Sequence, residues 1–413
     1  MKAFVGLIAV SAFLCFVPRP ARAEFADVPA GFWAYAQIEG CVAAGIVQGY
    51  TESSYCPDLA VTRDQMAAYI ARAVAGGESS VPGFAGTPSF PDVTEGFWAL
   101  KYMEYAVDEG VVTGYDDGRY HPEYEVNRAQ MAIYVARAML APSGEAGLAD
   151  YLPSDPRNFP DVPSDYLAYP HIEYCAEHGV VGGYDDGLYH PEIVVTRDQM
   201  AVYVAKAFDL VNPFAGTYSA TYPTGSMTVA IGVDGGASVI IIDASEEVLE
   251  GAGTVSDTGA LTATAQNDGA SMSVALSGQF INDGGAITGS GSMTGSMTAA
   301  WTAEKIADVG VNAFAGNWSG TYGGFESGTW QAVFDVNGSV TATAQSPSVG
   351  EVSLTGTISP VGFAYLEGSG SGTGGPFTIT WEGIFYMQAA DAVGTGVWDS
   401  TSGYFGEWSG QRQ

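Results

Sequence analysis

The stretch Phe25-Ala-Asp-Val28, followed by Phe32-Trp33 and then by Thr62-Arg-Asp-Gln-Met66, belongs to a motif that this chain contains in three similar copies. The same order of residues recurs without a gap over 90–131 and over 159–200. A repeat of this length indicates one supersecondary unit that is used several times. Because a repeated unit more often builds a binding surface than a catalytic centre, we interpret the first half of the chain as a binding region.

Two helices are predicted in each copy of the repeat. Residues 34–44 have the apolar periodicity of a helix, and Gly45 behind them is a typical C-terminal cap. The second helix opens at an N-cap residue with Gln three positions later, which is the capping-box pattern. These N-caps are Thr62, Asn127 and Thr196. We therefore expect an all-α triplet of helix–loop–helix lobes in a pseudo-threefold arrangement.

Each copy resembles an S-layer homology domain, and the resemblance covers about residues 24–210. It rests on the motifs quoted above and on Gly-Tyr-Asp-Asp-Gly-x-Tyr-His-Pro in copies two and three. The chain departs from the family where Gln65 and its two equivalents replace the usual Glu, and where Leu167 replaces Trp. The resemblance implies attachment to anionic, pyruvylated cell-wall polysaccharide. The implied domains are residues 24–76, 89–141 and 158–210.

A cation stands at the first position of each second helix, where it opposes the helix macrodipole. These cations are Arg63, Arg128 and Arg197. Because the free N–H groups of a helix start attract anions, an arginine beside them would strengthen a carboxylate site. The alternative is an internal salt bridge to a carboxylate of the repeat, namely Asp27, Asp92 or Asp161. The resemblance implies that the arginines contact the polysaccharide.

Trp33 and Trp98 are further candidates, because an indole ring can present a flat face to a sugar, although both would also suit a lobe core. Leu167 predicts a weaker site in the third copy, and we expect Arg197 to matter less there. The candidate ligand-binding residues are Arg63, Arg128, Arg197, Trp33, Trp98, Asp27, Asp92 and Asp161. No catalytic residue, metal ligand or cofactor is assigned.

Several other side chains invite a chemical interpretation. The Asp-Asp-Gly loops at 116–118 and 185–187 indicate tight turns, with calcium binding as the alternative. Cys41 and Cys175 occupy the same apolar position in copies one and three, which favours burial as small hydrophobic side chains. A Cys41–Cys56 bridge is the alternative in an exported protein.

Residues 212–413 change character and alternate apolar with polar positions between Gly-rich turns, as β-strands do. Phe214-Ala-Gly-Thr-Tyr218 recurs as Phe314-Ala-Gly-Asn-Trp318, which predicts two all-β meander units, barrel or sandwich, over 212–310 and 311–413. The strands are short for an outer-membrane barrel. An anchored hydrolase that uses paired carboxylates is the alternative function for this region. Its candidates are Glu326, Glu351, Glu367 and Glu382.

The first residues of the chain indicate an exported protein, and its net charge restricts the partners. Lys2, the apolar residues 3–17 and Ala21-Arg-Ala23 have the form of a secretory signal peptide over residues 1–23. A formal net charge of -32 disfavours nucleic acid and anionic lipid as partners. No later segment predicts a transmembrane helix. We expect a secreted, non-catalytic protein of the cell envelope that binds wall polysaccharide and has some capacity for self-assembly on the cell surface.

Overall fold

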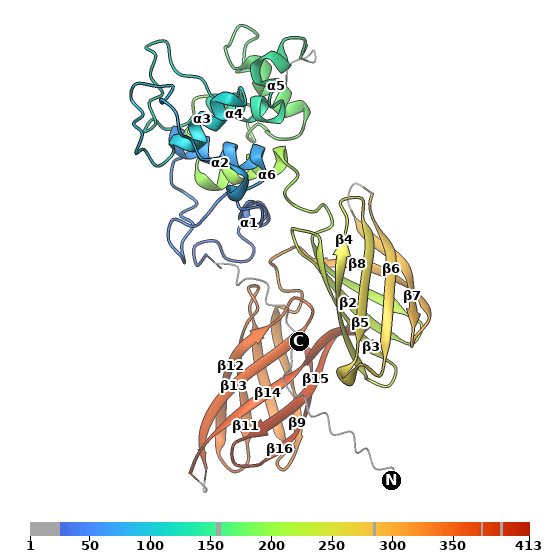
Figure 1. Cartoon of the computed structure of the whole chain (residues 1–413). Coiled ribbons are helices and arrows are strands. Elements are labelled where there is room, and N and C mark those ends of the chain that lie inside the picture. Colours follow the sequence, from blue (N-terminus) through green and yellow to red (C-terminus); the bar gives the residue numbers. More distant parts are fainter. Residues whose placement is uncertain (1–24, 154–157, 284–285, 373–374, 389–390) are drawn as a thin grey trace.

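The computed structural model describes residues 25–153, 158–283, 286–372, 375–388 and 391–413 (Figure 1). A helical region is followed by two closed barrels, each of eight antiparallel strands. This confirms the division into an all-α triplet and two all-β units, and it selects a barrel over a sandwich. The predicted signal peptide over 1–23 lies outside the described residues.

Two α-helices from each repeat make up the helical region. They are α1 (Tyr35–Ala43), α2 (Arg63–Ala75), α3 (Leu100–Asp108), α4 (Arg128–Met139), α5 (Tyr169–Glu177) and α6 (Arg197–Ala207), with 3-10 turns η1 (Glu78–Ser80) and η2 (Gly144–Leu148) between repeats. The capping boxes predicted at Thr62, Asn127 and Thr196 are present at the starts of α2, α4 and α6. None of the helices in the described ranges is long and apolar enough to cross a membrane.

The helices that pack against each other come from consecutive repeats. The pairs are α2 with α3, α4 with α5, and α6 with α1. At the centre, the N–H of Val126 donates to the carbonyl of Val61 at 2.9 Å, that of Val195 to Val126 at 2.9 Å, and that of Val61 to Val195 at 3.0 Å. This closed ring of hydrogen bonds gives the region its pseudo-threefold axis. Each lobe is therefore shared by two repeats, whereas the sequence predicted lobes made from one repeat each.

The first barrel closes through β8 and β1, and the second through β16 and β9. The strands of the first are β1 (Gly216–Tyr222), β2 (Gly225–Ile231), β3 (Gly236–Asp243), β4 (Val248–Val255), β5 (Ala260–Gln266), β6 (Ser273–Asn282), β7 (Ile287–Gly295) and β8 (Ala299–Ala307), with a 3-10 turn η3 (Asp268–Ala270). Those of the second are β9 (Gly316–Gly324), β10 (Gly328–Phe334), β11 (Ser339–Ser346), β12 (Gly350–Ile358), β13 (Phe363–Gly372), β14 (Gly375–Gln388), β15 (Asp391–Ser400) and β16 (Phe405–Arg412).

Apolar side chains fill both barrels. The interior of the second is dominated by aromatic rings, among them Trp330, Trp381 and Trp408. Glycines on neighbouring strands make room for these rings, since a Cβ placed on Gly396 would lie 2.7 Å from Cε2 of Trp408. The high glycine content of this region is thus a packing requirement of its large interior rings.

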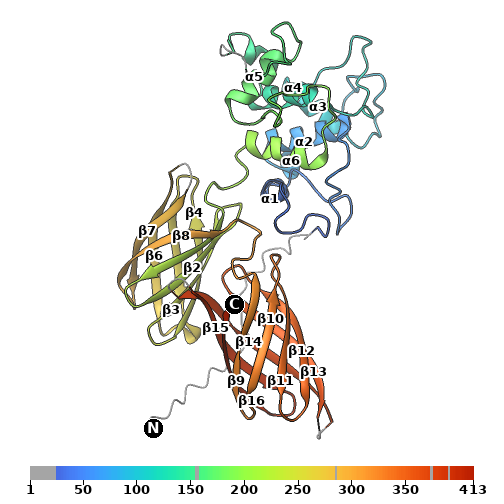
Figure 2. The ribbon, with the colours of Figure 1, turned by 180° about the vertical axis from the view of Figure 1, so that it is seen from behind.

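The two barrels also touch each other, as both views show (Figures 1 and 2). Ile240 and Ile242 on the outer face of β3 form an apolar cluster with Val361 and Ile384 of the second barrel. We call these four residues the barrel interface. It covers one outward face of each barrel.

Candidate functional site

The starts of α2, α4 and α6 are occupied by neighbouring repeats. The N–H of Arg63 donates to the carbonyl of Tyr124 at 2.9 Å, and the equivalent N–H groups of Arg128 and Arg197 donate to Ile193 and Leu59, each at 2.9 Å. The next N–H in each helix is also taken by the neighbouring repeat. The helix-start N–H groups that the sequence suggested for anion binding are therefore already paired.

The three arginine side chains are buried between repeats. Arg128, for example, donates from Nε to the carbonyl of Tyr189 at 2.7 Å, from Nη2 to that of Gly182 at 2.7 Å, and from Nη1 to the hydroxyl of Tyr203. Its guanidinium carbon lies 4.2 Å from the centre of the Tyr189 ring. Arg197 makes the three equivalent contacts with the first repeat, and Arg63 makes the two carbonyl contacts with the second repeat, to Tyr120 and Thr113. Each arginine thus joins its own repeat to the next.

No carboxylate neutralises these arginines. Among the residues that the structure describes, none of the three forms an ion pair, so the salt bridges weighed as the alternative are not formed. Carbonyl dipoles and tyrosine faces compensate the charges instead. A guanidinium has five N–H donors, and three are used in Arg128, so donors remain for an anionic ligand.

The candidate carboxylates organise loops. Asp27 accepts hydrogen bonds from the N–H groups of Tyr55 and Cys56, and Asp92 and Asp161 hold the equivalent loops of the other repeats. Burial alone would raise the pKa of Asp27, but hydrogen bonds from Ser54, Tyr55 and Cys56 together lower it. The same loop tyrosines donate their hydroxyls to the carbonyls of the arginines. These aspartates therefore hold the loops whose tyrosines contact the arginines.

The candidate tryptophans lie at the surface and not in a lobe core. Trp33 is 61% exposed and Trp98 is 53% exposed. The indole N–H of Trp33 donates to Asp198 at 3.0 Å, and that of Trp98 donates to Asp64 at 3.0 Å. Each indole is therefore fixed against the second helix of the preceding repeat.

A cavity of about 200 Å³ opens beneath Trp33. Its walls come from all three repeats, because Trp33 belongs to the first, Arg128 to the second, and Gly182, Tyr184 and Tyr203 to the third. We call this cavity the Trp33 groove. It brings together two of the predicted site residues, one aromatic and one cationic.

The pseudo-symmetry places the remaining candidates in equivalent positions. Trp98 contacts α2, and Tyr69 of the same helix accepts a hydrogen bond from Arg197. By the same symmetry Leu167 corresponds to α4, whose Tyr134 ring centre lies 5.7 Å from the guanidinium carbon of Arg63. The groove without an indole therefore contains Arg63. The sequence linked Leu167 to Arg197, whereas the pseudo-symmetry links it to Arg63, because each groove takes its arginine from a different repeat than its aromatic residue. That Leu167 weakens binding in its groove stays a prediction.

Sequence reasoning missed the tyrosines of the grooves and the aspartates that hold the indoles. Tyr184 and Tyr203 recur in the other repeats as Tyr115 and Tyr134, and as Tyr50 and Tyr69. The position of Asp64 and Asp198 is occupied by Ala129 in the second repeat. The groove that has Leu167 in place of Trp therefore also lacks the aspartate that would accept the indole N–H. This paired change is a signal that the repeat alignment contained.

The structure also shows the contacts of the Asp-Asp-Gly loops and the burial of the cysteines. A calcium ion in these loops would have to compete with histidines for the carboxylates of Asp117 and Asp186. Oδ2 of each aspartate lies 2.7 Å from Nε2 of His121 or His190, respectively. Cys41 and Cys175 are buried and free, and burial raises the pKa of both thiols to about 12. Both are the buried side chains that the sequence favoured.

Comparisons with known proteins identify the repeats. Residues 24–67, 89–132 and 158–201 match the S-layer homology domain, and these segments are three such domains. The chain is 30% identical over 141 residues to S-layer protein EA1 of Bacillus anthracis, which is 34% of this chain and 15% of that protein. It is 28% identical over 149 residues to the cellulosome-anchoring protein of Acetivibrio thermocellus, 36% of this chain and 31% of that one.

Other similarities are partial as well. An endoglucanase of Bacillus sp. (strain KSM-635) is 26% identical over 182 residues, 44% of this chain and 18% of the enzyme. The chain thus spans less than a third of the length of each of these relatives. Burkholderia oklahomensis agglutinin aligns with 48% of this chain and 95% of its own chain at 12% identity, with a TM-score of 0.15.

Proposed function

We propose that this protein, whose first half consists of three S-layer homology domains, is a secreted cell-envelope protein that attaches non-covalently to anionic cell-wall polysaccharide. The observation that carries the proposal is the buried Arg128, which lines a cavity together with the exposed Trp33, has donors to spare and forms no ion pair with any residue that the structure describes. The two barrels are presented outward for surface-layer contacts or ligand binding.

The groove suits an acidic sugar substituent. A carboxylate can accept charge-assisted hydrogen bonds from the free guanidinium N–H groups of Arg128, and a partly desolvated site strengthens them. Trp33 offers its face to the apolar side of a sugar ring, and Gln199 adds an amide. The role of pyruvylated polymer as the ligand follows the resemblance of the repeats.

An anchored extracellular hydrolase is the alternative. It would need facing carboxylates in the β region, and the packed interiors of both barrels favour the non-catalytic role. The candidate carboxylates Glu367 and Glu382 lie on neighbouring strands, β13 and β14, at the outside of the second barrel.

The experiment uses one position that the repeats share. Trp33→Ala in the full chain should weaken co-sedimentation with purified cell-wall sacculi about tenfold, as removal of an aromatic anchor commonly does. Leu167→Ala is the matched control, since Leu167 is 83% exposed at the equivalent place, and it should leave binding unchanged. Sacculi whose carboxylates have been amidated should bind neither the parent chain nor the Leu167→Ala variant.

A gain-of-function arm tests the same groove from the other direction. Leu167→Trp together with Ala129→Asp would rebuild the indole and its acceptor over Arg63. This double variant should bind sacculi more tightly than the parent chain. Equal losses in Trp33→Ala and Leu167→Ala, or unchanged binding to amidated sacculi, would contradict the proposal.

A further inference from the structure

One end of the second barrel lies away from the helical region (Figure 1), and the β9–β10 and β15–β16 loops carry exposed aromatic side chains. Phe325 is 61% exposed, Tyr404 is 44% exposed and Phe405 is 67% exposed. The rings of Phe325 and Tyr404 stack with their centres 3.8 Å apart and their planes 12° apart. We call these three residues the rim aromatics. The stack orients two of the rings although neither lies in a core.

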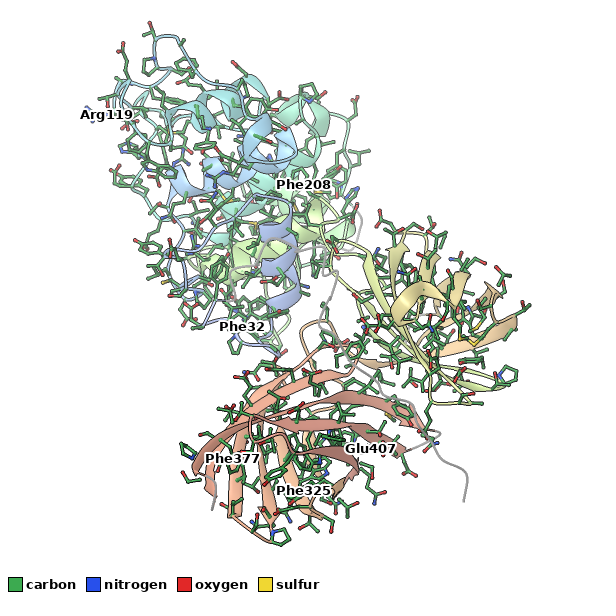
Figure 3. All side chains as sticks on the ribbon, turned by 60° about the horizontal axis from the view of Figure 1, so that its bottom comes forward. Phe32, Arg119, Phe208, Phe325, Phe377 and Glu407 are labelled. Carbon is green, nitrogen blue, oxygen red and sulfur yellow. The ribbon has the colours of Figure 1, made fainter. Side chains whose placement is uncertain are left out.

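A shallow depression of about 600 Å³ lies at the same end. Hydroxyl side chains surround an aromatic ring there, and none of the described lining residues is charged. Those residues include Ser369, Ser371, Thr378 and Thr401 around Phe377. Figure 3 shows Phe325 and Phe377 at this end of the barrel.

The depression and the rim aromatics lie on adjoining strands and loops of the second barrel. The strands that carry them, β13, β14, β15, β16 and β9, are successive neighbours around the barrel. The N–H of Thr401 donates to the carbonyl of Thr378 at 3.0 Å, and the N–H of Phe325 donates to the carbonyl of Phe405 at 3.2 Å. Backbone hydrogen bonds therefore join the loops across the rim.

The barrel fold does not require aromatic residues at these positions. The first barrel closes in the same way, yet its corresponding loops contain Pro223-Thr224 and Ser296-Met-Thr298. Exposed aromatic rings are unfavourable in water, and a patch of them rimmed by polar groups commonly marks an interaction site. The difference between the two barrels therefore points to a ligand of the second.

We propose that this distal face of the second barrel binds a neutral polysaccharide. Sugar rings have apolar C–H faces that fit the rim aromatics, and hydroxyl edges that can exchange hydrogen bonds with the uncharged Ser and Thr side chains of the depression. The net charge of -32 opposes an anionic ligand where no arginine is present to offset it. The ligand class is thus different from the anionic polymer proposed for the grooves.

Native electrophoresis of the full chain in gels that contain hydroxyethylcellulose, yeast mannan or amylopectin tests the proposal. At least one of these neutral polymers should retard the protein. Phe325→Ala with Tyr404→Ala should raise the apparent dissociation constant about tenfold or more, because both rings of the stacked pair are removed. Tyr365→Ala is the matched control, since Tyr365 is an exposed aromatic residue on the side of the same barrel.

The outcomes separate this site from the grooves. Trp33→Ala should be retarded like the parent chain, so loss of retardation in that variant would place the binding in the helical region and overturn the proposal. Absence of retardation by all three polymers would overturn it too. Concentration-dependent dimerisation that is lost in the double variant, without any retardation, would show instead that the rim aromatics join two copies of this chain.

Discussion

At the scale of single residues, the three arginines connect repeats as well as facing the grooves. Arg128→Ala would leave the carbonyls of Gly182 and Tyr189 without donors in a buried place. We expect the free energy of unfolding of the helical region to fall by about 1.5–3 kcal/mol, the usual cost of losing charge-assisted hydrogen bonds. Urea unfolding should show this loss, whereas Arg119→Ala, which removes an exposed arginine, should be neutral.

From the helix macrodipole alone, alanine variants of these arginines would be expected to leave the fold intact, because a cation at a helix start opposes the dipole. Burial between repeats reverses the conclusion, because the contacts made by the side chain outweigh its unfavourable position. If Arg128→Ala unfolded like the parent chain, the inter-repeat role of the arginine would be wrong.

Glycines in the barrels provide a second test at this scale. A Cβ on Gly396 would lie 2.0 Å from the carbonyl oxygen of Glu382, whereas a Cβ on Gly323 would meet nothing within 4 Å. Gly396→Ala should therefore lower the free energy of unfolding of the second barrel by about 1–3 kcal/mol, as overpacking does, and with it the melting temperature. Gly323→Ala should not lower it. Similar melting temperatures for the two variants would argue against the close packing of strands around the interior rings.

At the scale of elements, Glu78 ties α2 to α3. Its carboxylate accepts hydrogen bonds from Lys101 at 2.7 Å and Tyr102 at 2.9 Å, and it pairs with Arg72. Burial alone would raise the pKa of Glu78, but these partners lower it from 4.5 to about 2. Because the folded-state pKa is the lower one, the stabilisation is present above 4.5 and is lost as the pH falls toward 2.

The difference in unfolding free energy between the parent chain and Glu78→Gln should therefore be largest near neutral pH and should shrink through that acidic window. The side chain is 37% exposed, so solvent screening keeps the difference small. Glu123→Gln, at an exposed position, is the control and should show no such dependence. A difference that stayed constant down to the lower limit of the window would exclude this role of Glu78.

The sequence predicted the elements better than their partners. The capping boxes at Thr62 and Asn127 depend on residues three apart, so the second helices could be located locally. Which repeat supplies the arginine of each groove depends on the ring of hydrogen bonds through Val61, which no local pattern encodes. For the same reason the pairing of Leu167 with Arg63 emerged only from the structure.

At the scale of the whole molecule, the two barrels are coupled more closely than a tandem repeat suggests. The repeat predicts that residues 311–413 unfold cooperatively alone, and this remains a prediction. The strand residues Val239-Ile-Ile-Ile242 interrupt the alternation seen elsewhere, and a continuous apolar run indicates burial on both faces. That run contains half of the barrel interface, so the sequence held a signal of the contact.

The linker between the barrels also lies against the helical region. A Cβ on Gly310 would be 2.2 Å from the ring of Tyr35 in α1. The connection from the helical region passes Gly40, where a Cβ would be 2.6 Å from the carbonyl oxygen of Leu210. The three parts of the chain therefore meet around α1.

Ile384→Asp in the full chain tests the barrel interface. A carboxylate placed among Ile240, Ile242 and Val361 would be desolvated without a partner, so the barrels should separate while each keeps its own interior. Calorimetry should then resolve the two barrels as separate transitions, and small-angle scattering should give a larger radius of gyration. Val333→Asp, on the exposed outer face of β10, should change neither measurement, because Val333 is 47% exposed and lies outside the interface. If the two variants gave the same scattering and the same transitions, the contact between the barrels would contribute nothing to their arrangement.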